Sequence, residues 1–87
     1  MENFLRNTIE STREEALTWT AADGGLTMAA SDLLACCSAA EKHLGNNDPQ
    51  AMVTWAGGWE GAFNCSTGPE SDLVSACLRW AKEVIEA

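Results

Sequence analysis

Apolar side chains recur every three or four residues along four stretches of the chain, and this spacing constrains the fold more than any other feature. The stretches cover residues 2–20, 27–44, 48–63 and 67–85. Residues spaced in this way share one face of an α-helix, and four such helices bury their apolar faces against one another. The sequence therefore predicts an all-α fold, a small four-helix bundle, with residues 1–87 in a single helical domain.

Capping residues predict where these helices begin and end. The second helix starts near Thr27 or Ser31, of which Ser31 is a good N-cap candidate, and Gly45 stops it. Asp48-Pro49 combines an N-cap with a proline at the first helical position. Thr67-Gly68-Pro69-Glu70 has the spacing of a capping box for the fourth helix.

Residues 17–28 leave an alternative open. In the helical interpretation, the first helix runs to about Thr20 and the turn-forming sequence Ala22-Asp23-Gly24-Gly25 stops it. The apolar runs on either side of this turn also suit a short β-hairpin, which would make the fold α+β. An isolated two-stranded ribbon is weak unless it is packed, so the helical interpretation is preferred.

Three glycines weaken the prediction of a third helix. Gly57, Gly58 and Gly61 each cost about 1 kcal/mol relative to alanine in a helix interior. Either tertiary packing holds this helix, with the glycines allowing close approach of another backbone, or the helix breaks at Gly57. A strand over Met52 to Trp55 is a further alternative.

The chain also resembles itself when it is shifted by 40 positions. Ten of the 47 aligned pairs are identical, among them Trp19 with Trp59 and Cys37 with Cys77. An internal repeat predicts two helix–turn–helix hairpins related by duplication. In that arrangement Trp19 lies on a helix, as Trp59 does.

The charge balance bounds the kind of partner. Thirteen acidic residues stand against five basic ones, for a formal net charge of −8. Direct binding to nucleic acid or to an anionic membrane needs positive charge and is therefore not expected. The composition favours a basic protein partner, in particular one that handles nucleic acid, because carboxylates can occupy sites built for phosphates.

The sequence offers no sign of export or membrane insertion. Its first residues lack the apolar core of a signal peptide, and no stretch approaches the roughly 20 apolar residues of a membrane helix. A cytoplasmic location is therefore expected, in the host cytoplasm if the gene belongs to a phage.

Few residues suit catalysis, a metal or a cofactor. The single histidine, His43, has no cysteine placed beside it, and no C-x-x-C pair occurs among the four cysteines Cys36, Cys37, Cys65 and Cys77. No enzyme activity, cofactor or metal is expected, and Cys37 and Cys77 are interpreted as small buried side chains. Acyl carrier proteins resemble this chain in being small, acidic and four-helical, but their Asp-Ser-Leu motif appears here in the altered order Ser31-Asp32-Leu33.

The candidate partner-binding residues are carboxylates near helix starts, one further acid, and a tryptophan beside the glycines. They are Asp23, Asp32, Asp48, Trp55, Glu60, Glu70 and Asp72. If consecutive helix starts meet at one end of the bundle, most of these carboxylates form an acidic rim there.

Two functions follow as hypotheses. The first is a non-enzymatic, stoichiometric inhibitor that blocks a basic nucleic-acid-binding surface. In size and charge it is similar to the anti-CRISPR and anti-restriction proteins of phages and mobile elements and to toxin-immunity proteins. The alternative is a helical adaptor or dimerisation module, including a homodimer, that binds through an apolar surface at Trp55 and its glycine neighbours.

Overall fold

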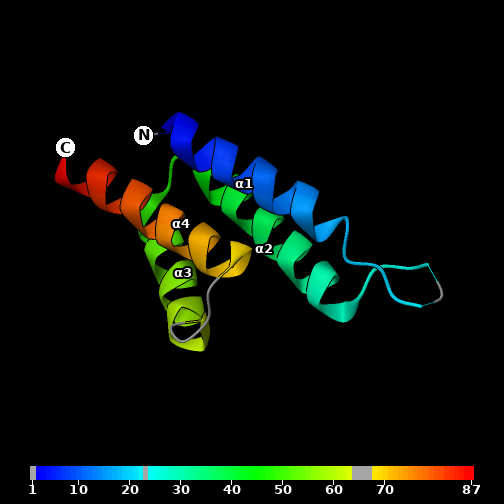
Figure 1. Cartoon of the computed structure of the whole chain (residues 1–87). Helices are drawn as coiled ribbons and strands as arrows, with labels where there is room; N and C mark the ends of the chain where they lie inside the picture. The colour runs from blue at the N-terminus through cyan, green and yellow to red at the C-terminus, as the bar shows by residue number, and fades with distance from the viewer. Residues whose placement is uncertain (1, 23, 64–67) are drawn as a thin grey trace.

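The structure is a computed structural model that describes residues 2–22, 24–63 and 68–87, with residues 59–63 described by their backbone alone. Within these ranges the chain forms four α-helices (Figure 1): α1 (Glu2–Ala16), α2 (Met28–Gly45), α3 (Pro49–Phe63) and α4 (Pro69–Glu86). The prediction of a small all-α four-helix bundle is confirmed. No helix of the described residues is both long and apolar enough to cross a membrane.

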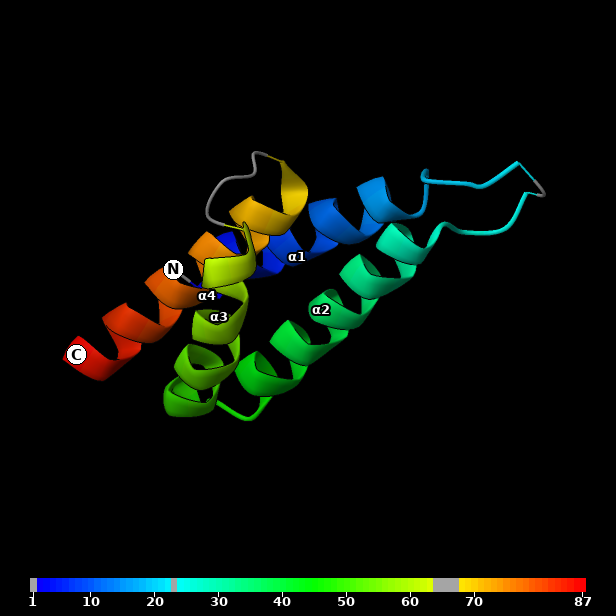
Figure 2. The ribbon, with the colours of Figure 1, turned by 90° about the horizontal axis from the view of Figure 1, so that it is seen from below.

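The helices alternate in direction. Helix α1 runs antiparallel to α2 and to α4, whereas α3 crosses them steeply and packs mainly against α4 (Figures 1 and 2). As a result, α3 begins near the C-terminal end of α2, far from the residue at which α2 itself begins.

The apolar stripes predicted from the spacing meet in one core. Leu5, Leu73 and Met52 are fully buried, and Trp80 is 2% exposed. Full burial of a side chain of this size stabilises the fold by about 1.5–3 kcal/mol. The core residues are Leu5, Ile9, Ala16, Leu33, Cys36, Cys37, Ala40, Leu44, Met52, Ala56, Leu73, Val74, Ala76, Cys77, Trp80 and Ala81.

The junction between the first two helices differs from the prediction. Helix α1 ends at Ala16, four residues before Thr20, and the Thr18 hydroxyl donates to the Glu15 carbonyl (2.7 Å) just past that end. The N-cap of α2 is Thr27, whose Oγ1 accepts from the backbone N–H of Ala30 (3.1 Å). Ser31 lies inside the helix, so its prediction as the N-cap is wrong.

Residues 17–22 and 24–27 extend beyond the bundle and contain only a trace of the alternative β-hairpin (Figure 2). Thr20 and Leu26 form an isolated antiparallel bridge, and the Thr27 N–H donates to the Trp19 carbonyl (3.0 Å). Gly24 has a φ of +87°, a left-handed conformation that favours glycine. The described residues of this segment form no strand, as expected for a ribbon without a packed face.

Helix α3 continues through the glycines. Asp48 caps it as predicted, because Oδ1 of Asp48 accepts from the backbone N–H of Ala51 (3.1 Å). Beyond the helix's own backbone, a Cβ atom added at Gly57 or Gly58 would meet none of the described atoms within 4 Å. Buried Met52 and Ala56 hold the helix against the core, so these two glycines are not required for a close approach within the fold.

The start of α4 also differs from the predicted capping box. Gly68, with a φ of +133°, occupies the N-cap position and provides no side-chain hydrogen bond. Glu70 is therefore the second helical residue, whereas the predicted capping box requires the glutamate at the third. The expected cap residue, Thr67, lies outside the described residues.

The helix boundaries agree with the 40-residue repeat only in part. Helices α2 and α4 begin at nearly equivalent positions, Met28 and Pro69, but α1 and α3 end at Ala16 and Phe63. Trp19 lies outside α1, so its predicted helical position is wrong. The duplication itself stays a prediction.

Candidate functional site

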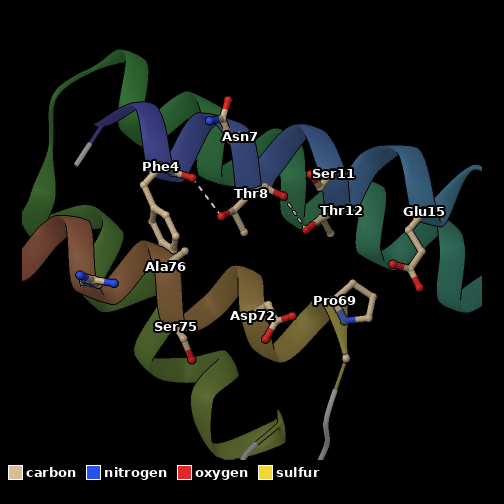
Figure 3. A pocket seen from close by; sticks show the side chains of 12 residues that line it. Phe4, Asn7, Thr8, Ser11, Thr12, Glu15, Pro69, Asp72, Ser75 and Ala76 are labelled. Carbon is tan, nitrogen blue, oxygen red and sulfur yellow. Dashed lines mark hydrogen bonds between the residues drawn. The ribbon is translucent and has the colours of Figure 1, made fainter.

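A groove of about 670 Å³ lies between α1 and α4 (Figure 3). It exists because the facing rows of the two helices carry short side chains, including Thr8 and Ser11 on α1 and Ser75 and Ala76 on α4. The lining residues are Phe4, Asn7, Thr8, Ser11, Thr12, Glu15, Gly68, Pro69, Asp72, Ser75, Ala76 and Arg79.

Two threonine hydroxyls on the α1 wall have their hydrogens engaged. Thr8 Oγ1 donates to the Phe4 carbonyl at 2.9 Å, and Thr12 Oγ1 donates to the Thr8 carbonyl at 2.7 Å (Figure 3). A hydroxyl has one hydrogen and two acceptor lone pairs, so both groups can still accept hydrogen bonds. Asn7 and Ser11 on the same wall can both donate and accept, so the wall as a whole offers both kinds of hydrogen-bonding group.

The two ends of the groove differ in charge. Both walls contribute an exposed carboxylate: Glu15 lies at one end of the groove beside Pro69, and Asp72 lies further along the α4 wall (Figure 3). Among the described residues neither carboxylate has an ion-pair partner. At the other end, the guanidinium carbon of Arg79 lies 5.3 Å from the centroid of the Phe4 ring, within the range of a cation–π contact.

The structure brings only two of the predicted partner-binding residues together. Asp72 lies in the groove and Glu70 is two residues away in the first turn of α4. Glu70 is half-buried, and its Oε2 atom has no hydrogen-bond partner among the described residues. Asp72 is thus the predicted carboxylate that lines the groove, together with Glu15.

The remaining predicted carboxylates do not join this pair. Asp32 is exposed near the start of α2 and Asp48 follows its end, so at 1.5 Å per residue they lie roughly 20 Å apart along the bundle. The predicted acidic rim is therefore not assembled. Asp23 and the side chain of Glu60 lie outside the described part of the chain.

Trp55 forms a second, more apolar surface with its neighbours. Its ring is half-buried against the core, and its centroid lies 6.0 Å from that of His43 with the planes tilted by 49°. Gly58, three residues further along α3, is exposed on the neighbouring side of the helix. One flank of the tryptophan is therefore bordered by a residue without a side chain.

Another groove, of about 480 Å³, lies between α1 and α2, and its arginines are engaged in ion pairs. It contains Glu10, Glu14 and Glu41 together with two arginines. Arg13 forms an ion pair with Glu41 across the helices, and Arg6 contacts Glu2 at 3.2 Å. Paired cations thus offset much of its acidity.

The buried cysteines are poorly suited to nucleophilic chemistry. Burial raises the pKa of Cys77 to about 12, with smaller contributions from Cys37 and Cys36. Burial also raises the pKa values of Cys36 and Cys37, whereas nearby Arg13 favours the Cys37 thiolate. At neutral pH these thiols stay protonated, and a protonated thiol is a weak nucleophile. In the described ranges, His, Cys, Asp and Glu side chains form no group that could hold a metal ion.

Reasoning from the sequence missed Glu15, Phe4 and Arg79. The spacing of Phe4, Thr8, Ser11 and Glu15 does place one row along α1, but only the antiparallel contact with α4 turns that row into a wall. Comparisons with protein-family models, curated protein sequences and solved structures found no match for this chain. Its function must therefore be inferred from its own residues.

Proposed function

We propose that this protein is a non-enzymatic, acidic binding module that acts as a stoichiometric inhibitor by covering a basic, nucleic-acid-binding surface of a target protein. The observation that supports the proposal is the set of exposed carboxylates without an ion-pair partner among the described residues. These are Glu10, Glu14, Glu15, Asp32, Asp48, Asp72, Glu83 and Glu86.

Unpaired surface carboxylates give a small bundle a negative field over much of its surface. Such a field accelerates association with a basic partner and disfavours acidic ones. Helices hold these groups on a stable framework, so ordering them on binding costs less than ordering a flexible acidic tail. We place the encounter in the cytoplasm, and in size and charge the protein is similar to anti-CRISPR, anti-restriction and toxin-immunity proteins.

The test is the salt dependence of binding to the protein's partner. Affinity capture from the native host followed by mass spectrometry identifies candidate partners, and calorimetry with the purified candidate measures affinity. We expect a basic, nucleic-acid-handling protein whose affinity falls by about tenfold or more between low and high salt, and which duplex DNA displaces. An affinity that does not change with salt or DNA would overturn the proposal.

A second function is favoured by the surface around Trp55. Gly57 and Gly58 are exposed in the middle of α3 and leave open space where a partner side chain or backbone can approach. A helical adaptor or homodimer would use this surface, with the charge serving solubility. In that case Trp55→Ala abolishes association, whereas Asp48→Lys leaves it unchanged.

Trp55 also packs against the core, so a variant that spares the core is needed. Gly58→Gln adds bulk at an exposed position and blocks the Trp55 surface without removing a buried side chain. Loss of binding in Gly58→Gln at unchanged melting temperature supports the adaptor. Unimpaired binding in this variant argues for the acidic surface.

A further inference from the structure

We propose that two copies of this chain associate through the segment that joins α1 to α2, by pairing Leu26 of one copy with Leu26 of the other in an antiparallel β-bridge. Residues 17–22 and 24–27 of this segment are called the arm below. The inference concerns a surface other than the acidic one and goes beyond the proposed function.

The arm has one backbone edge that is unpaired. Thr20 and Leu26 form an antiparallel bridge, and its two hydrogen bonds, donated by Thr27 and Ala21, lie on either side of the pair. In such a pair the N–H and C=O groups of the two bridged residues point to the outer edges of the ribbon. On one edge, the Thr20 N–H donates to the Thr18 carbonyl (3.1 Å). On the other edge, neither the N–H nor the C=O of Leu26 has a hydrogen-bond partner among the described residues.

An edge of this kind is complementary to itself. In a hydrogen-bonded antiparallel pair, two opposite residues exchange both of their N–H···O=C bonds. Leu26 offers one donor and one acceptor on the same side, so a two-fold axis between two copies lets each Leu26 satisfy the other. A ribbon of two extended segments is weak by itself, whereas pairing two arms sets four such segments side by side.

The same edge carries exposed apolar side chains. Leu26 is 41% exposed, and Met28, the first residue of α2, is 84% exposed. Because Thr27 between them has an extended backbone, Leu26 and Met28 lie on the same face of the chain. Pairing at Leu26 brings the Cβ atoms of the two leucines within about 5 Å of each other and removes apolar surface from water.

The distribution of charge favours a second copy over a basic partner at this surface. From Ala16 to Ser31 the sequence contains one charged residue, Asp23, although the whole chain carries −8. A basic protein therefore gains little attraction at the arm, whereas two copies of the acidic chain meet there with little local repulsion. The arm extends beyond the bundle (Figure 2), so pairing at its edge brings the arms together rather than the acidic helices.

The expected dimer is weak and depends on salt. The paired edge is short, and contacts below about 1,200 Å² belong to transient complexes, for which a dissociation constant of about 0.1–1 mM is expected. Two like-charged copies repel each other, and salt screens this repulsion. Self-association should therefore strengthen by about twofold or more between low and high salt. This is opposite in sign to the salt effect expected for a basic partner.

The test measures the full chain without any ligand. Sedimentation equilibrium up to about 2 mM protein detects association in the expected range. Over the same concentrations, ¹⁵N–¹H spectra and amide hydrogen exchange locate the contact. We expect the Leu26 amide to shift and to exchange more slowly as the dimer forms, because its N–H gains a hydrogen-bond partner only there.

Two lysine variants separate the Leu26 edge from the rest of the arm. Leu26→Lys and Leu17→Lys each replace an exposed leucine and change the net charge equally. Only Leu26→Lys sets two like charges directly opposite each other in the dimer. We expect Leu26→Lys to weaken self-association about tenfold or more and Leu17→Lys less than about twofold.

A third variant tests the backbone hydrogen bond without adding a charge. Leu26→Pro removes the N–H of an edge position, where proline is tolerated, and should also weaken self-association about tenfold. Melting temperatures of the three variants confirm that each is folded.

Four results would overturn the inference. They are no association at about 2 mM protein, equal effects of Leu26→Lys and Leu17→Lys, and loss of the dimer in Gly58→Gln but not in Leu26→Lys, which would place the contact at the Trp55 surface. The fourth is a Leu26 amide that is protected by the captured partner but not by a second copy, which would identify a strand of the partner as the occupant.

The two salt experiments keep this inference separate from the proposed function. If self-association is absent while salt weakens the complex with the captured partner, the inference fails and the proposed function stands. If partner binding is insensitive to salt while Leu26→Lys disrupts a dimer that salt strengthens, the proposed function fails alone.

Discussion

Replacing Gly57 and Gly58 by alanine is expected to stabilise the protein. Both residues lie in the middle of α3, and neither has a positive φ. Apart from the nearby backbone of α3 itself, an added Cβ meets no atom of the described residues within 4 Å at either position. The substitution therefore brings no clash and no new contact, which leaves helix propensity as the effect that decides the outcome.

The magnitude follows from the propensity scale. Glycine is about 0.8–1.0 kcal/mol less favourable than alanine in a helix interior, so the double variant gains about 2 kcal/mol if the effects add. For a domain of this size, 1 kcal/mol moves the melting temperature by about 4–8 °C. A rise of about 8–15 °C is therefore expected for the double variant.

Thermal and urea unfolding followed by circular dichroism measure this change. Gly24→Ala is the matched control, because a Cβ there also meets no atom within 4 Å among the described residues outside its chain neighbours, but φ is +87°. A left-handed conformation costs a residue with a Cβ about 1–2 kcal/mol, so Gly24→Ala is expected to destabilise. A lower melting temperature for Gly57→Ala or Gly58→Ala would refute the placement of an open, regular helix at these positions.

Three further predictions concern stability. Thr27→Ala removes the N-cap of α2 and should lower the free energy of unfolding in urea by about 1 kcal/mol. Ser31→Ala should change it by less than about 0.5 kcal/mol. A larger loss for Ser31→Ala than for Thr27→Ala would show that Ser31 is the cap. Leu73→Ala truncates a fully buried side chain and should cost about 2–5 kcal/mol by the same assay, and a cost below about 1 kcal/mol would contradict its burial. Folding raises the pKa of Cys77 from 9.0 to about 12, so above pH 9 the unfolded chain binds fewer protons than the folded one and stability falls. At pH 10 this thiol accounts for about 1.4 kcal/mol of the lost stability. Urea unfolding at pH 8 and pH 10 checks this, because Cys77→Ala should lack that part of the loss.

The helical fold was largely predictable because its signals are local. The stripe of Leu33, Cys37, Ala40 and Leu44 is buried as predicted, and Asp48 caps α3 as predicted. Thr27 and Ser31 are four residues apart, about one helical turn, so the same apolar stripe suits either start. Periodicity therefore does not decide between them, and only the hydrogen bond from Ala30 does.

The candidate site was less predictable because it joins residues distant in the chain. The position of Asp72 near a helix start identifies it from the sequence, whereas Glu15, which lines the same groove, resembles many other exposed acids. The acidic rim was expected because helix starts were assumed to meet. Alternating helix directions separate Asp32 from Asp48, so that pattern does not form.

The sequence by itself determined the charge excess and the helical stripes, because charge is a sum over residues and amphipathicity arises within one turn of a helix. The tertiary structure alone decided which surfaces face each other. The contact between α1 and α4 depends on how the buried faces of Leu5 and Leu73 pack in one core. That packing leaves the short side chains of Ser11 and Ser75 on facing walls and brings Glu15 and Asp72 into the lining of one groove.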